Sequence, residues 1–199
     1  SYTWDVEVGD LDGDFDVDFI VNDGFHRQGA FINRSDGSAL ASSAGQLAFR
    51  DVSSLVFPWG MLDSAFQVYQ ELADLDGDRD LDLVGVNWGL DSADAHVDAF
   101  YCNQGGVLLH SGDLPNTSEI AEHAVAIVDV ENDGDLDFVK GTRYPDQLFI
   151  NTGVGPGALT FVEEQFAAVS DWTVDLQAAD FDGDGDHDVV AALHGRDHL

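Results

Sequence analysis

The chain has 199 residues, of which 44% are apolar, and its 39 acidic residues against 7 basic ones give a net charge of -32 at pH 7. A surface this acidic repels phosphate backbones and anionic lipids, so we expect no nucleic-acid partner. No apolar run approaches the length of a membrane span, so we expect no membrane insertion either.

Taken in chain order, the residues predict strands that repeat as one unit. An alternating segment from Trp4 predicts a half-buried strand, and the apolar run after Asp18 predicts a second strand. A third strand is expected to end at Asn33, and a turn rich in glycine and serine leads to a fourth apolar run from Gln46. Further first strands are predicted at FQVYQEL from Phe66, HAVAIV from His123 and TVDLQAA from Thr173. Four antiparallel strands without a long helix are typical of one β-propeller blade.

An acidic motif lies between the first two strands of every unit. It reads DLDGDFDVDFIV from Asp10, DLDGDRDLDLVG from Asp74, DVENDGDLDFVK from Asp129 and DFDGDGDHDVVA from Asp180. Each copy holds five acidic residues, so like charges repel one another within every loop. A bound cation would offset this repulsion, and the recurrence in register predicts a metal-binding loop.

Calcium is the cation that the spacing favours, because Ca²⁺ takes six to eight oxygen ligands from a flexible loop. Carboxylates stand at positions 1, 3, 5 and 9 of each motif, and the backbone carbonyl at position 7 is expected to be a further ligand. The longer side chain of Glu131 makes the third loop the least regular. The alternative is an acidic, solvated loop without metal. The candidate ligands of about four structural Ca²⁺ ions are Asp10, Asp12, Asp14, Asp16, Asp18, Asp74, Asp76, Asp78, Asp80, Asp82, Asp129, Glu131, Asp133, Asp135, Asp137, Asp180, Asp182, Asp184, Asp186 and Asp188.

The loops are not EF-hands. An EF-hand needs a glutamate at position 12, and none of the four copies has one there. It also needs glycine at position 6, where the first two copies carry Phe15 and Arg79. We expect these two side chains to strain or weaken their turns.

The acidic loops, the apolar strand after each loop and the strands ending in Asn33, Asn103 and Asn151 resemble the FG-GAP or VCBS repeats. This family includes the blades of integrin alpha subunits. The resemblance implies a calcium-binding β-propeller in which each loop holds Ca²⁺ between strands one and two of its blade. Some propellers with these repeats are lyases or dehydratases, but no residue here can be matched to such a site.

We therefore expect an all-β fold of antiparallel four-stranded β-propeller blades. The approximate blades are residues 1–56, 57–111, 112–164 and 165–199, and the last of them is incomplete. About three and a half blades do not close a propeller, which usually takes four to eight. We favour a segment of a longer, partial propeller over one completed intermolecularly by self-association through open blade edges.

The end of the blades away from the acidic loops is the candidate ligand-binding face. The turns between strands two and three and the interblade loops gather there, and loops on a rigid scaffold commonly carry function. Aromatic and basic side chains in these loops suit a glycan or a protein ligand. Trp59 could instead cap the core between blades, and loop histidines are usually solvated. The candidate residues are His26, Arg27, Trp59, Trp88, Arg143, Tyr144, His194 and Arg196.

These patterns predict an extracellular calcium-binding module for adhesion or ligand recognition, with calcium as a structural ion. Weak, oxygen-rich calcium sites fill best where calcium is millimolar, so we expect a secreted or cell-surface protein. The alternative is a structural subunit of an extracellular assembly or filament whose incomplete blade is completed by a neighbouring chain. The chain has no recognisable catalytic motif, so we expect no enzymatic activity. The single Cys102 fits a buried core position better than a nucleophile.

Overall fold

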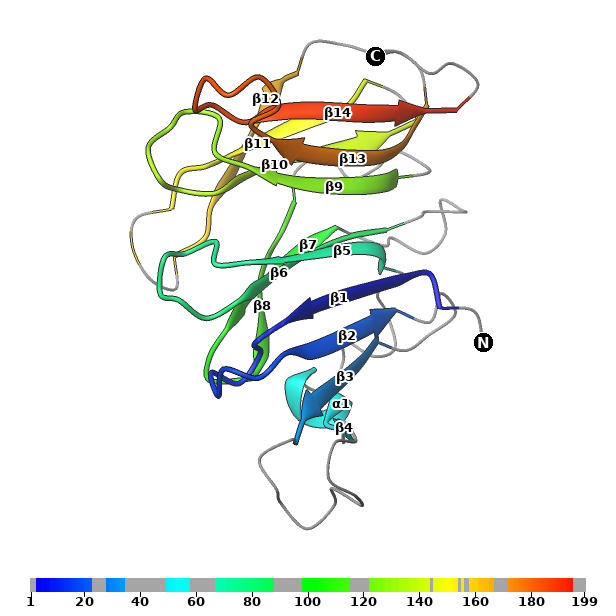
Figure 1. Ribbon diagram of the computed structural model, residues 1–199, viewed down its shortest axis with the longest axis vertical. Coiled ribbons are helices and arrows are strands. Elements are labelled where there is room, and N and C mark those ends of the chain that lie inside the picture. The colour runs from blue at the N-terminus through cyan, green and yellow to red at the C-terminus, as the bar shows by residue number, and fades with distance from the viewer. Residues whose placement is uncertain are drawn as a thin grey trace.

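Three antiparallel sheets of four strands and one two-stranded hairpin make up the protein (Figure 1). The computed structural model describes residues 3–22, 28–34, 49–57, 67–87, 98–114, 122–143, 145–153, 155, 158–166 and 172–194. Within these ranges the single helix is the one-turn α1 (Ser53–Val56), so the all-β prediction is confirmed. None of the described helical structure is long and apolar enough to cross a membrane.

Each strand pairs with the next strand in the chain, which makes every sheet a simple meander. The first sheet holds β1 (Asp5–Gly9), β2 (Asp18–Asn22), β3 (Gln28–Asn33) and β4 (Phe49–Asp51). The second holds β5 (Gln67–Ala73), β6 (Asp82–Asn87), β7 (Ala99–Asn103) and β8 (Leu108–Asp113). The third holds β9 (Glu122–Val128), β10 (Asp137–Thr142), β11 (Gln147–Asn151) and β12 (Phe161–Gln165). The hairpin holds β13 (Thr173–Ala179) and β14 (Asp188–Leu193).

The strands lie where the sequence predicts them. The alternating segment from Thr173 to Ala179 is β13 without any shift of its ends, and the first strands of the other units match within two residues. The strand β4 begins only at Phe49, because the start of the predicted run at Gln46 lies outside the described residues. The fourth unit contributes two strands among the described residues.

Successive sheets pack face to face, and an apolar layer fills the space between each neighbouring pair (Figure 1). Between the first and second sheets lie Ile20, Ile32 and Phe57 on one side and Leu83 and Leu108 on the other. Between the second and third lie Val84, Phe100 and Cys102 against Phe138, Phe149 and Phe161. Between the third sheet and the hairpin lie Val139 and Ile150 against Leu176. The core is therefore a series of layers between sheets, which places each loop beside the next sheet.

Buried polar contacts also join neighbouring sheets. The Lys140 ammonium in the third sheet donates at 2.9 Å to Asp98, which directly precedes β7 of the second sheet, and both side chains are almost completely buried. The Thr173 hydroxyl of the hairpin donates at 2.9 Å to Asp146, which directly precedes β11 of the third sheet. A buried ion pair is costly to break, because removing one partner leaves the other charge in an apolar environment. These contacts fix which sheet faces which.

The first strands of the four sheets, β1, β5, β9 and β13, lie side by side along one edge of the stack (Figure 1). Each of them contacts the first strand of the next sheet. The fold therefore brings residues from all four units to one common edge.

One face of the first sheet has no other sheet packed on it within the described part of the chain. There Phe19 stacks on Phe31 with ring centroids 4.8 Å apart, and Phe49 meets Phe19 edge to face and is 40% exposed. The same trio in the third sheet is Phe138, Phe149 and Phe161, which the second sheet buries. The exposed aromatic face of the first sheet is thus equivalent to the face of the third sheet that packs against the second sheet.

Candidate metal centre

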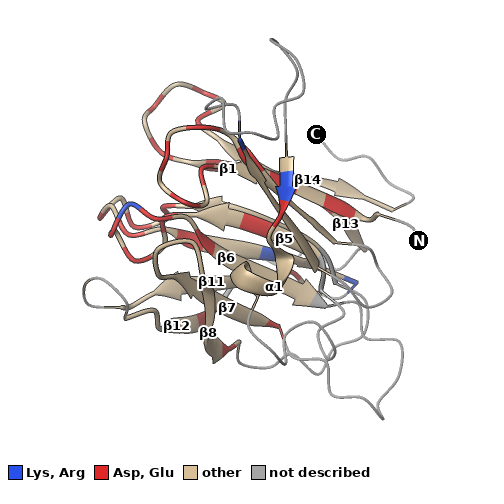
Figure 2. Cartoon of the chain, turned by 90° about the horizontal axis from the view of Figure 1, so that it is seen from below, with Lys and Arg blue, Asp and Glu red and all other residues tan. Residues whose placement is uncertain are grey.

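The four acidic loops join the first strand of each sheet to the second, and they gather at one end of the sheets (Figures 1 and 2). Figure 2 shows that acidic residues line these loops and that few basic residues lie near them. One basic side chain does approach the first loop: the Arg34 guanidinium lies 3.9 Å from Asp12. The fold therefore keeps the acidic residues of the loops close together with few basic residues to offset their repulsion.

In three of the four loops, the aspartate at position 1 accepts hydrogen bonds from the backbone of the turn. In the first loop Asp10 accepts from the N–H groups of Gly13, Asp14 and Phe15 at 2.8–3.1 Å. The equivalent Asp180 accepts in the same way from its own turn, and Asp129 accepts two such bonds. In these loops the backbone is thus wound around one carboxylate.

The aspartate at position 9 ties each of the first three loops to its own sheet. Asp18 is fully buried, and its carboxylate accepts from Leu11 N–H in the loop and from Asn33 N–H in β3. Asp82 and Asp137 repeat this arrangement with Asn103 and Asn151. Burial raises the pKa of Asp82 to about 7, although the backbone N–H groups that it accepts from act in the opposite direction. Without a cation, burial of this negative charge is unfavourable.

Three of the four loops bring carboxylates close enough to share one ion. In each of these loops three carboxylate oxygens lie within 4.8 Å of one another. The groups are Asp10 with Asp12 and Asp18, Asp74 with Asp76 and Asp78, and Asp180 with Asp182 and Asp188. The described residues form no such group in the third loop, where Glu131 replaces the aspartate at position 3. The remaining predicted ligands lie in the same loops, and their assignment stays a prediction.

The second loop also contains a carboxylate oxygen that the protein itself does not satisfy. The Oδ1 atom of Asp74 is buried and has no hydrogen-bond partner, whereas the equivalent Asp10 and Asp180 accept three bonds each. A buried, unsatisfied carboxylate oxygen is unfavourable unless a cation or another donor reaches it. The donor set consists of hard oxygen atoms, which fits calcium. The Cys102 thiol lies beside Asp76 and Asp82 but is buried in the core, as expected, and burial raises its pKa.

The turns at position 6 are strained in the two loops that lack glycine there. Phe15 has φ +67° and Arg79 has φ +80°, in the left-handed region that side chains rarely adopt. The equivalent Gly134 and Gly185 have φ +93° and +101°. All four loops therefore share one backbone shape, and the predicted strain at Phe15 and Arg79 is confirmed.

Two asparagines, Asn103 and Asn151, connect the first and the second loop to the sheet that follows each of them, and their role was not apparent from the sequence. The Asn103 side chain donates at 3.1 Å to the carbonyl of Leu11 in the first loop and to the carbonyl of Leu81 in its own loop. Asn151 donates in the same way to Leu75 and Leu136. The recurrence of asparagine at the end of each third strand was the available signal. Residues of one sheet thus hold the loop of the preceding sheet in place.

The third and fourth loops contact each other directly. The Asn132 side-chain amide donates to Asp186 at 2.7 Å, and the Asp129 N–H donates to Nδ1 of His187 at 3.1 Å. The His187 ring is therefore directed toward the neighbouring loop. The four loops form a connected row rather than four isolated turns.

At the opposite end, two of the candidate ligand-face residues meet around a tryptophan. The Trp172 ring stacks on His194 with centroids 4.6 Å apart, and the Arg143 guanidinium lies 5.5 Å from the Trp172 ring centroid. Arg143 and His194 are exposed and Trp172 is half-buried. The other candidates, His26, Arg27, Trp59, Trp88, Tyr144 and Arg196, lie outside the described residues.

Residues 129–191 match the family model of the FG-GAP-like repeat. The matched segment includes the third and fourth acidic loops and runs from one sheet into the next. The resemblance identified from the sequence is thus confirmed, and this segment carries an FG-GAP-like repeat. No curated protein matches the chain significantly.

Proposed function

We propose that the four sheets are successive blades of a β-propeller and that their acidic loops bind Ca²⁺ as a structural ion. The stacking of the sheets in chain order, with first strands side by side, supports the propeller arrangement. The FG-GAP-like repeat over residues 129–191 supports it as well. In this arrangement the loops lie at one end of the blades and leave the other end for ligands.

The observation that carries calcium binding is the convergence of three carboxylate oxygens in the first, second and fourth loops. The buried, unsatisfied Oδ1 of Asp74 adds to it. A bound Ca²⁺ would offset the repulsion within each loop. It would also stabilise the contact between loop and third strand, because Asp18 and Asp82 accept hydrogen bonds from the backbone N–H groups of Asn33 and Asn103. Calcium would thus serve the fold rather than a reaction.

The function that we propose for the module is adhesion or ligand recognition outside the cell. The exposed Arg143 and His194, grouped around the half-buried Trp172, offer polar groups beside aromatic rings. Such a surface suits a sugar ring or an exposed protein loop. A secreted or cell-surface location would also supply the calcium that weak loops require.

A subunit of an extracellular assembly is the second candidate, and one observation favours it. The aromatic face formed by Phe19, Phe31 and Phe49 corresponds to a face that is buried in the third sheet. We propose that another sheet of the same kind covers it. A uniform oligomer in sedimentation, lost on Phe49→Lys, would support completion by a second copy. A monomer at all concentrations would refute the assembly.

Calcium-dependent stability tests the proposed function. Asp76→Asn and Asp182→Asn each remove a charge from a converging group, and Glu164→Gln removes one from the exposed surface of β12. A site filled at a hundred times its dissociation constant contributes about 2.7 kcal/mol, so each loop variant should lose about that much in calcium and little in chelator. Equal melting temperatures of the wild type in calcium and in chelator would refute calcium binding.

A further inference from the structure

The residue at position 2 is held from two sides in the first and second acidic loops. Leu11 and Leu75 are each 2% exposed, and their N–H groups donate at 2.9 Å to the aspartates at position 9 of their own loops. Their carbonyls accept from asparagine side chains of the following sheet. At the same position of the third and fourth loops, Val130 and Phe181 are 44% and 57% exposed. Among the described residues, the first two loops are therefore the ones most closely held by the next sheet.

Asn103 contacts two acidic loops at once. Its side-chain amide donates at 3.1 Å to the carbonyl of Leu11 in the first loop and to the carbonyl of Leu81 in the second. Its backbone N–H donates at 2.8 Å to Asp82, and a carboxylate oxygen of Asp82 lies within 4.8 Å of one of Asp76. Since Asn103 is 2% exposed, water does not readily replace these bonds. One residue thus fixes the backbone of the first loop and a predicted ligand of the second.

The turn that follows Asn103 lies against the first loop as well. The Gly106 N–H donates to the side-chain oxygen of Asn103 at 2.8 Å, and a Cβ atom at Gly106 would lie 3.6 Å from the Cβ of Asp12. Asp12 is one of the three converging acids of the first loop. A movement of Asp12 would therefore act directly on the turn that orients the Asn103 amide.

Asn151 repeats the arrangement one sheet further along. Its side-chain amide donates to the carbonyl of Leu75 in the second loop at 2.8 Å and to the carbonyl of Leu136 in the third at 3.3 Å. Its backbone N–H donates at 2.8 Å to Asp137, the predicted ligand at position 9 of the third loop. The first three loops are thus joined in series by two bridging asparagines, Asn103 and Asn151.

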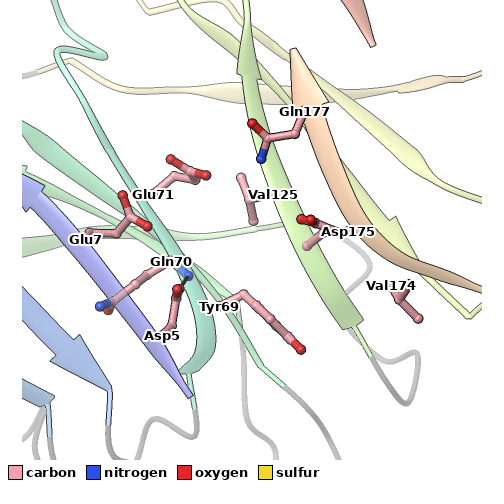
Figure 3. Close-up of a pocket in the computed structure, with 10 residues that line it drawn as sticks. Asp5, Glu7, Tyr69, Gln70, Glu71, Val125, Val174, Asp175 and Gln177 are labelled. Carbon is pink, nitrogen blue, oxygen red and sulfur yellow. Dashed lines mark hydrogen bonds between the residues drawn. The ribbon is translucent and has the colours of Figure 1, made fainter. Parts of the chain in front are cut away.

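The first two sheets are also joined along their first strands, away from the loops. The backbone N–H of Gln70 in β5 donates to Asp5 of β1 at 2.7 Å (Figure 3). Beside this bond, burial raises the pKa of Glu71 to about 8, and the charge of Glu7 contributes to the rise. None of these residues belongs to an acidic loop. This edge therefore keeps β1 and β5 in place but does not link their loops.

We propose that Asn103 and Asn151 couple neighbouring loops, so that Ca²⁺ binding in one loop strengthens binding in the next. The inference rests on the calcium binding proposed above. When the first loop is filled, the Leu11 carbonyl between Asp10 and Asp12 is ordered, and the Asn103 amide is ordered with it. The second loop then loses less conformational entropy when it binds, because Asn103 is already in place. By linkage, filling of the second loop strengthens binding in the first by the same factor.

Amide hydrogen exchange of the whole chain, followed by mass spectrometry along a calcium titration, tests the proposal. Peptides covering residues 10–18 and 74–82 report the filling of the first and second loops separately. Asp12→Asn removes a charge from the converging group of the first loop. It should raise the calcium concentration at which residues 74–82 are half protected by at least about fivefold. When Asn103→Ala is already present, the addition of Asp12→Asn should leave this midpoint unchanged.

Asn151→Ala is the matched control, because it removes equivalent bonds at the next junction. It should shift the midpoint of residues 74–82 itself, since Leu75 belongs to that loop, but keep the effect of Asp12→Asn at about fivefold or more. Gln104→Ala, at the exposed neighbour of Asn103, should keep that effect too. If the two asparagines served stability alone, Asn103→Ala and Asn151→Ala would behave alike.

The outcomes separate the coupling from calcium binding itself. Calcium-dependent protection of both segments, with no effect of Asp12→Asn on residues 74–82, would overturn the coupling and leave calcium binding standing. An effect of Asp12→Asn that persists in Asn103→Ala would overturn the role of the asparagine. If the wild type shows no calcium-dependent protection in any loop, both the coupling and the proposed calcium binding are wrong.

Discussion

Replacement of Asn103 tests the connection between successive sheets. Asn103 is 2% exposed, and its side chain makes three hydrogen bonds: it donates to Leu11 and Leu81 and accepts from Gly106. A net value of about 1 kcal/mol per bond gives about 3 kcal/mol for Asn103→Ala. The loss rises toward about 5 kcal/mol if water does not reach the two carbonyls left behind. Since domains are stable by about 5–15 kcal/mol, the variant should be visibly weakened.

The assay is urea unfolding in saturating calcium, with Gln104→Ala as the control. Gln104 is the exposed neighbour in the chain, so its truncation should cost less than about 0.5 kcal/mol. Asn103→Ala should also weaken calcium binding by the first loop, because Leu11 belongs to that loop although Asn103 belongs to the second sheet. If the two variants are equally stable, the asparagine does not hold the sheets together and this part of the account is wrong.

Three further predictions follow from the strain, the buried ion pair and the raised pKa values. Phe15→Gly should stabilise the protein by about 0.5 kcal/mol, because Phe15 is 95% exposed and glycine adopts its φ of +67° without strain. A lower melting temperature of this variant would contradict the strain. Lys140→Ala should lower the free energy of unfolding, measured with urea, by about 3–5 kcal/mol, because it leaves the Asp98 charge buried and unpaired. The double variant Lys140→Met with Asp98→Asn should lose much less. Equal losses would mean that the buried charge of Asp98 is unimportant. Glu71 holds its proton up to about pH 8 in the folded state and only to about 4.5 when unfolded, so stability should fall as pH rises between these values. Glu71→Gln should remove about 2 kcal/mol of that fall, allowing for screening, and parallel pH profiles would refute the assignment.

The sequence predicted the strands and loops because their signals are local. Alternation at Thr173–Ala179 and the spacing of aspartates from Asp10 depend only on neighbouring residues, and both appear in the fold as expected. The strain at Phe15 could be predicted as well, because position 6 of such a loop requires a positive φ whatever residue occupies it.

Contacts between sheets could not be predicted in the same way. The partner of Lys140 is 42 residues away, and the carbonyl that accepts from Asn103 is 92 residues away. Glu7 and Glu71 look like ordinary surface residues in alternating strands, and only the side-by-side placement of β1 and β5 brings them together. Such sites depend on how the sheets stack, which no local pattern specifies.

The number of calcium ions bound per chain tests the central claim most directly. It is measured by metal analysis after dialysis against dilute calcium, with chelator-treated protein as the control. The account predicts three ions, one for each loop with converging carboxylates, or four if the third loop also binds despite Glu131. A value near zero would mean that the aspartates form only an acidic surface, and calcium binding as the basis of the fold would have to be abandoned.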